Sequence, residues 1–164
     1  MSYRLPFPKG TKYKEKNPKG IFAHGNFPEC KYARDFVVKV GTPVLSIGEG
    51  IIVKIKASSN KYLNPIKDPK FKKILKLKDS AKLKRLKEEL ERFAAKYTNY
   101  VLIKHENGTY AEYAHFGKNR IVVKKNQKIK QGELLGYIGY SGIMSEPHLH
   151  LNVFKIISIP IKLK

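Results

Sequence analysis

The sequence predicts a mainly β protein, with an antiparallel sheet or sandwich that is interrupted by one Lys-rich helical insertion. Short runs rich in β-branched and aromatic residues alternate with turns, which is typical of all-β folds. Between residues 58 and 98 this pattern stops, and apolar residues recur at helical spacing instead. With 164 residues, 41% of them apolar and 29% charged, the chain is long enough for one domain with its own core.

The N-terminal part divides into an arm and the start of that domain. Residues 1–20 predict an irregular basic arm, because prolines, glycines and lysines dominate them. Residues 21–164 predict a single domain. Its first strands are expected at 36–40, 44–47 and 51–55, the last two on either side of a glycine turn.

The insertion, residues 58–98, is the most basic part of the chain. Residues 61–98 hold 13 Lys and Arg against 5 Asp and Glu, a net charge of 13 − 5 = +8. Asp79 and Ser80 offer a helix N-cap, and the apolar spacing that follows predicts a helix at about 80–97. We interpret its basic face as a solvated surface, with binding of a polyanion as the alternative.

Strands resume after the insertion. Residues 100–105 and 109–116 flank Asn107-Gly108, a strong hairpin signal because both central residues of such a turn need positive φ. Further strands are expected at 120–123, 133–138 and 148–156.

The charge balance is strongly positive. Lys and Arg number 34 and Asp and Glu 13, a net charge of +21. This predicts anionic surroundings such as a nucleic acid, a membrane face or a wall polymer; Lys enrichment for solubility or thermal stability is the alternative.

One cysteine, Cys30, excludes an intrachain disulfide and a four-cysteine zinc site. We expect no transmembrane segment, and no signal peptide is visible in this chain.

The histidines are the candidates for chemistry. His148 and His150 lie two residues apart on a predicted strand and therefore share a face, which suits a zinc ligand, an acid–base group or two surface histidines. By the same alternation Tyr113 and His115 share a face. If these two strands are neighbours, three imidazoles converge. Asp35 begins another strand, either as a hard metal ligand or as an exposed turn residue.

Motifs in a fixed order then indicate a family. The chain resembles the lysostaphin/LytM-type zinc metallopeptidases, which cut peptide bonds in bacterial cell-wall peptidoglycan. The resemblance runs from about His24 to Phe154, apart from the insertion. The motifs that carry it are Tyr32-Ala33-Arg34-Asp35-Phe36, Gly41-Thr42-Pro43-Val44, Asn99-Tyr100-Val101-Leu102-Ile103, Tyr113-Ala114-His115-Phe116, Gly132-Glu133-Leu134-Leu135-Gly136-Tyr137-Ile138-Gly139 and Pro147-His148-Leu149-His150.

The resemblance implies a LytM-type fold, one zinc ion per chain, and hydrolysis of peptidoglycan peptide bonds through a zinc-activated water. His150 and Asp35 correspond to zinc ligands, and His115 and His148 to catalytic groups whose division of roles stays open. It also implies a cell-envelope or extracellular location. The scissile bond, in a polyglycine bridge or a D-amino-acid cross-link, stays open.

The first zinc ligand departs from the common pattern. The family usually has a histidine four residues before the aspartate, where this chain has Lys31. A branch with a similar Tyr-Ala-x-Asp-Phe signature places the histidine further upstream, which points to His24. Cys30 is the other local candidate, and a site without this ligand is the third possibility. His105 matches no functional motif and is interpreted as structural or exposed.

Two rival functions remain. A LytM-type relative that has lost ligands would work as a binding or activator module for cell-wall enzymes. A basic nucleic-acid-binding protein would explain the charge but not the ordered histidines, so no specific nucleic acid is expected as a partner. The expected partner is a peptidoglycan peptide or another anionic wall polymer; the sequence leaves the oligomeric state open.

Overall fold

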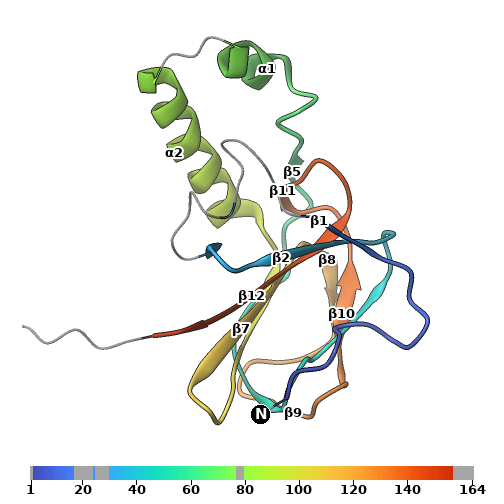
Figure 1. Ribbon diagram of the computed structural model, residues 1–164. Helices are drawn as coiled ribbons and strands as arrows, with labels where there is room; N and C mark the ends of the chain where they lie inside the picture. The colour runs from blue at the N-terminus through green and yellow to red at the C-terminus, as the bar shows by residue number, and fades with distance from the viewer. Residues whose placement is uncertain (1, 17–23, 25–29, 77–79, 157–164) are drawn as a thin grey trace, which may run out of the picture.

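The computed structural model describes residues 2–16, 24, 30–76 and 80–156 (Figure 1). These residues form the mainly antiparallel β fold that the sequence predicts. The strands are β1 (Lys14–Lys16), β2 (Arg34–Val37), β3 (Pro43–Leu45), β4 (Gly50–Lys56), β5 (Tyr62–Leu63), β6 (Tyr100–Lys104), β7 (Thr109–Ala114), β8 (Phe116–Ile121), β9 (Lys128–Ile129), β10 (Leu134–Ile138), β11 (Gly142–Ile143) and β12 (His148–Lys155). The helices are α1 (Pro69–Lys76) and α2 (Ser80–Tyr97).

Two sheets enclose the core. The larger has the strand order β1-β2-β12-β7-β6-β4-β9, and the smaller has the order β3-β10-β8. The buried side chains of both sheets form one cluster, which includes Phe36, Ile103 and Leu149 from the larger sheet and Val44 and Leu135 from the smaller. Side chains alternate along a strand. In the larger sheet, the residues that neighbour a core-facing residue in sequence therefore point to the outer face.

That outer face carries the residues singled out by the sequence. In β12, Leu149 faces the core, so His148 and His150 stand on the opposite side. In β2, Phe36 faces the core and Asp35 the outer side. Asp35 lies directly opposite His150 in the register of these two strands. The pairing of β2 with β12 therefore brings together side chains that are 115 positions apart in the chain.

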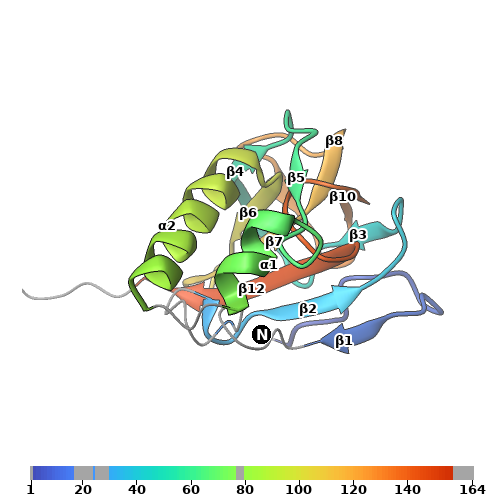
Figure 2. The same cartoon turned by 90° about the horizontal axis from the view of Figure 1, so that it is seen from above.

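The insertion packs as a unit beside the sheets, with α1 and α2 next to each other (Figure 2). It has its own small core of Phe71, Leu86 and Leu90. α2 occupies the segment in which the sequence predicts a helix. At its C-terminal end Lys56 Nζ donates to the carbonyl oxygens of Ala95 and Lys96, which satisfies helix carbonyls that lack an internal partner.

Two local features differ from the sequence prediction. The segment before residue 17 is not irregular throughout, because β1 pairs with β2 and Phe7 is buried in the core against Phe36. Burial of this aromatic ring, together with the pairing of β1 with β2, favours an ordered arm. β3 and β4 are the two strands expected on either side of the glycine turn, and they belong to different sheets. In the hairpin between β6 and β7 only Gly108 has positive φ, whereas Asn107 does not.

Neither described helix has the length and apolar character needed to cross a membrane.

Candidate functional site

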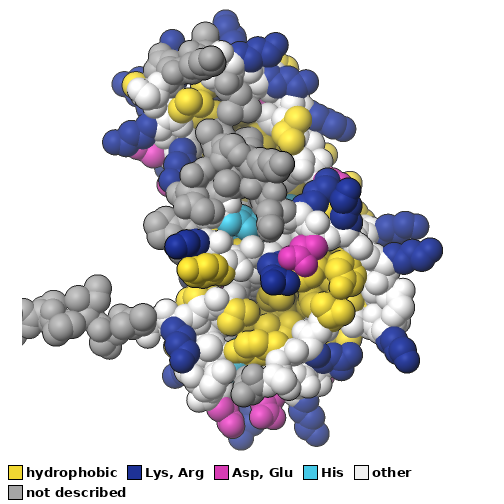
Figure 3. Space-filling model, viewed as in Figure 1, with side chains coloured by type: hydrophobic (Ala, Val, Ile, Leu, Met, Phe, Trp, Pro, Cys, Tyr) yellow, Lys and Arg dark blue, Asp and Glu magenta, His cyan; other side chains and the backbone are white. Residues whose placement is uncertain are grey.

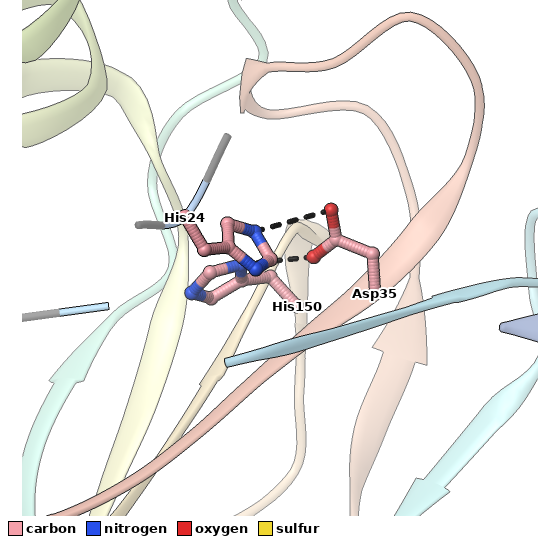
Figure 4. A group of neighbouring side chains, drawn as sticks. All are labelled: His24, Asp35 and His150. Carbon is pink, nitrogen blue, oxygen red and sulfur yellow. Dashed lines mark hydrogen bonds and ion pairs between the residues drawn. The ribbon is translucent and has the colours of Figure 1, made fainter. Parts of the chain in front are cut away.

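Three side chains converge on the outer face of the larger sheet: His24, Asp35 and His150 (Figure 4). One potential ligand atom from each lies within 4.8 Å of the others. His150 Nδ1 is 3.0 Å from Asp35 Oδ1, and His24 Nε2 is 3.4 Å from Asp35 Oδ2. Two imidazole nitrogens and one carboxylate oxygen are a donor set that zinc accepts in catalytic sites. Within the part of the chain that the structure describes, His24, Asp35 and His150 are the group whose ligand atoms lie close enough together to hold a metal ion.

Hydrogen bonds orient the members of this group. His24 Nδ1 donates to the carbonyl oxygen of Ala33 at 2.9 Å, which leaves Nε2 directed at Asp35. A carbonyl partner on the remote ring nitrogen is the usual way in which proteins fix a metal-binding imidazole.

Hydrogen bonds between the histidines and Asp35 stabilise the charged form of Asp35 and shift the pKa of His24. Burial of Asp35 acts to raise its pKa, but hydrogen bonds from His150 and His24 outweigh burial and hold the pKa far below its usual range. The hydrogen bond to Asp35 raises the pKa of His24. Asp35 is therefore a carboxylate in the folded protein.

His115 and His148 adjoin this group, with ring centroids 4.4 Å apart. His115 Nδ1 donates to the carbonyl of Ser141 at 2.7 Å, and His148 Nδ1 donates to the carbonyl of Glu146 at 2.8 Å. Both Nε2 atoms are thereby left without the proton, and that of His148 lies 3.8 Å from Asp35 Oδ1. Burial lowers the pKa of each histidine, most strongly that of His115. Both rings are therefore neutral near pH 7.

The backbone of His115 explains how its ring reaches the site. Tyr113 points into the core, where its hydroxyl accepts a hydrogen bond from the backbone N–H of Ile47 at 2.9 Å. The prediction that Tyr113 and His115 share a face is therefore wrong. His115 has a φ of 74°, and both its N–H and that of Phe116 approach the carbonyl oxygen of Asn99, at 2.9 and 3.4 Å. This bulge turns the imidazole out of the strand alternation and toward His148.

The other residues considered from the sequence lie outside the group. Cys30 is half-buried and Lys31 is exposed, and neither is among the three potential ligands. His105 is 2% exposed and its Nδ1 donates to the carbonyl of Glu49 at 2.6 Å, so it is a structural core histidine.

Glu112 is a neighbour of the site that sequence reasoning missed. It lies on β7 opposite Asn152, two residues from Ala114, which itself lies opposite His150. Burial raises the pKa of Glu112, while the charges of His150 and Lys54 act to lower it. The alternation of β7 could have identified it, because Ala111 and Tyr113 on either side of it face the core.

Part of this chain matches a known peptidase family, and proteins that act on or divide the cell are similar to it in sequence. Residues 87–159 match Peptidase family M23. The peptidoglycan DD-endopeptidase ShyA of Vibrio cholerae is 28% identical over 116 residues, which are 71% of this chain and 18% of that protein. The cell division protein DipM of Caulobacter vibrioides is 42% identical over 57 residues, which are 35% of this chain and 9% of DipM. The chain spans about a fifth of the length of the first curated relatives it matches.

Solved structures show the same fold. A zinc-containing peptidase from Vibrio cholerae matches with a TM-score of 0.55 and 20% identity, over 93% of this chain and 36% of that chain. The catalytic domain of lysostaphin from Staphylococcus simulans matches with a TM-score of 0.53 and 22% identity, over 89% and 84% respectively. These findings confirm the resemblance to the lysostaphin/LytM-type peptidases.

Proposed function

Because the chain has the fold and the motifs of the M23 peptidases, we propose that it is a zinc metalloendopeptidase that hydrolyses peptide bonds in bacterial peptidoglycan. The observation that carries this proposal is the convergence of His24, Asp35 and His150 beside the paired rings of His115 and His148. Peptidoglycan as substrate implies a cell-envelope or extracellular place of action.

One zinc ion per chain would be held by His24, Asp35 and His150. Three protein ligands are the number found in catalytic zinc sites, which keep one position for water or substrate. The bound ion supplies a water of lowered pKa and polarises the scissile carbonyl.

His115 and His148 supply the proton transfers. With Nδ1 fixed as donor to a backbone carbonyl, each ring presents Nε2 as a base toward the site. One Nε2 takes the proton of the attacking water as the new C–O bond forms. The same proton then passes to the leaving amine as the C–N bond breaks. The other ring takes a proton from solvent on its Nε2 as negative charge develops on the carbonyl oxygen, and it donates a hydrogen bond to that oxygen; this proton returns to solvent when the product leaves.

Two further points support this assignment over its rivals. A non-catalytic module would not need all five side chains, and here all five lie in one connected group. The relatives named peptidoglycan DD-endopeptidases support a D-amino-acid cross-link over a polyglycine bridge as the scissile bond.

Digestion of purified peptidoglycan tests the proposal. Zinc-loaded protein is incubated with cross-linked peptidoglycan of either bridge type, and mass spectrometry identifies the new amino termini. We expect cleavage in the D-amino-acid cross-link, and a loss of about 100-fold or more in rate for His148→Ala and for His115→Ala. His105→Ala is the matched control and keeps the rate. Absence of new termini with both substrates at full zinc loading would contradict the proposal.

A further inference from the structure

The positive charge of the insertion is concentrated at one of its ends. Residues 67–87 hold ten Lys and Arg against two Asp and Glu, a net charge of +8, whereas residues 88–98 hold two against three. The excess therefore belongs to α1, the first half of α2 and the residues next to them. Repulsion between neighbouring cations opposes such a concentration, and charge that serves solubility alone needs no single location.

This end of the insertion projects away from the two sheets. Lys70 Nζ lies 2.7 Å from Glu89 Oε1, and Phe71 packs with Leu86 and Leu90, so the start of α1 lies beside the middle of α2. The end of α1 is close to the start of α2 along the chain, whereas the other end of α2 leads into β6. Figure 1 shows α1 and the start of α2 at the opposite end of the molecule from β9.

Exposed cations from both helices lie at this end. We name them the cationic tip, which consists of Lys72, Lys73, Lys76, Lys82, Lys84 and Arg85. The three lysines of α1 lie on the side of that helix opposite Phe71 and Ile74, which pack in the core of the insertion. Figure 3 shows Lys and Arg side chains around the outline of this end of the molecule.

The charges of the cationic tip oppose the stability of α2. The first turn of α2 holds Lys82 and no acidic residue, although the dipole of a helix favours anions at its start. A polyanion beside the cationic tip would relieve both this unfavourable contact and the repulsion among the six cations. The structure therefore favours an anionic partner over a basic face that is merely solvated.

The chemistry of the two helices narrows the class of partner. The described side chains of α1 and α2 include no exposed large hydrophobic residue. Helices that bind a membrane surface bury apolar side chains in it, and proteins that hold single-stranded nucleic acid stack its bases on aromatic rings. The cationic tip offers charge without either kind of surface, which suits a flexible polymer with regularly spaced phosphates and neither bases nor acyl chains.

We propose that the cationic tip binds a phosphodiester polymer that is attached to the bacterial wall. The choice of a wall polymer rests on the proposed function, because that function places the protein at the wall. α2 has 18 residues and is therefore about 27 Å long. Asn99, just beyond its other end, accepts a hydrogen bond from the N–H of His115. The polymer is thus held well away from the catalytic histidines, and it raises the effective concentration of wall peptide without occupying the site.

Binding of fluorescent poly(glycerol phosphate) to the whole protein, measured by anisotropy over a range of salt concentrations, tests the cationic tip. Two variants each remove three of its charges, and glutamine is used because its helix propensity is close to that of Lys and Arg. The α1 variant carries Lys72→Gln, Lys73→Gln and Lys76→Gln, and the α2 variant carries Lys82→Gln, Lys84→Gln and Arg85→Gln.

The matched control removes the same charge at the opposite end of the molecule, through the exposed residues Lys124→Gln, Lys125→Gln and Lys128→Gln beside or within β9. Each tip variant should weaken binding about tenfold or more at low salt. It should also reduce the slope of log affinity against log salt by about 2, because three phosphate contacts are lost. The control should stay within about twofold of the wild type. Wild-type affinity in both tip variants, or an equal loss in the control, would overturn the proposal.

Two other polyanions test the class of partner. Duplex DNA and vesicles that contain phosphatidylglycerol are compared at the same phosphate concentration. We expect both to bind more weakly than poly(glycerol phosphate). Tighter binding of either one that the tip variants abolish would overturn the assignment of a wall polymer.

The outcome is separable from that of the proposed function, because binding of the polymer requires no hydrolysis. A protein that cuts no peptidoglycan, but whose tip variants lose the polymer, would refute the peptidase and retain the polymer site. A protein that cuts peptidoglycan, but whose tip variants bind the polymer as the wild type does, would do the reverse.

Discussion

Asn99 connects the insertion to the strand that leads into the candidate site, and its substitution should lower the stability of the protein. The side chain is fully buried where α2 leads into β6. Its amide nitrogen donates to the carbonyls of Ser59 and Phe116 at 2.8 and 3.0 Å, and its amide oxygen accepts from the N–H of Ser59 at 3.0 Å. It thereby joins the first residues of the insertion to the residue that follows His115.

The expected cost follows from these three bonds. Each contributes about 1 kcal/mol net, and Asn99→Ala also leaves the buried backbone N–H and carbonyl of Ser59 without Asn99, whereas the carbonyl of Phe116 keeps its bond from the Ser141 hydroxyl. We expect a loss of about 3 kcal/mol in the free energy of unfolding. Asn99→Asp should cost at least as much, because it replaces both donors by an oxygen facing two carbonyl oxygens.

Chemical denaturation of the zinc-free protein measures this loss. Asn107→Ala, on the exposed β6–β7 turn, is the control and should cost less than about 1 kcal/mol, since exposed hydrogen bonds contribute little. A loss below about 1 kcal/mol for Asn99→Ala would contradict this stabilising role of Asn99, because the three buried hydrogen bonds would then contribute almost nothing to stability.

Three further predictions concern the histidines and the carboxylate. His115→Gly should melt above His115→Ala in a thermal scan, with a free-energy difference of about 1 kcal/mol, because only glycine adopts a φ of 74° without strain. His105→Ala should lower the free energy of unfolding by about 2 kcal/mol in denaturant, yet leave the zinc content unchanged, because its ring is buried away from the site. The zinc-free protein should lose stability in denaturant as the pH falls below about 5, because the pKa of Asp35 is far lower in the folded chain than in the unfolded chain; Asp35→Asn should flatten this loss.

The sequence predicted the structure correctly where it depends on a periodic pattern within one strand or one helix. Alternation around Leu149 placed His148 and His150 on one face, because only the apolar residue between them suits the core. The periodic leucines and the candidate cap residues Asp79 and Ser80 predicted a helix where α2 lies, since the apolar stripe must be buried. Asp79 itself lies outside the described residues.

Features that depend on contacts distant in sequence were not accessible in this way. The positive φ of His115 comes from the bulge against Asn99, which alternation within one strand cannot reveal. The burial of Phe7 depends on Phe36, and the contact between Tyr62 and Tyr140 depends on the pairing of β5 with β11.

The proposed zinc site is tested by the zinc content of the wild-type protein and of His24→Ala, measured by elemental analysis after zinc loading and dialysis. We expect about one zinc per chain in the wild type, a clear loss in His24→Ala and full retention in the control His105→Ala. A wild-type protein that retains no zinc would contradict the metallopeptidase. Zinc fully retained by His24→Ala would contradict the three-ligand site at His24, Asp35 and His150.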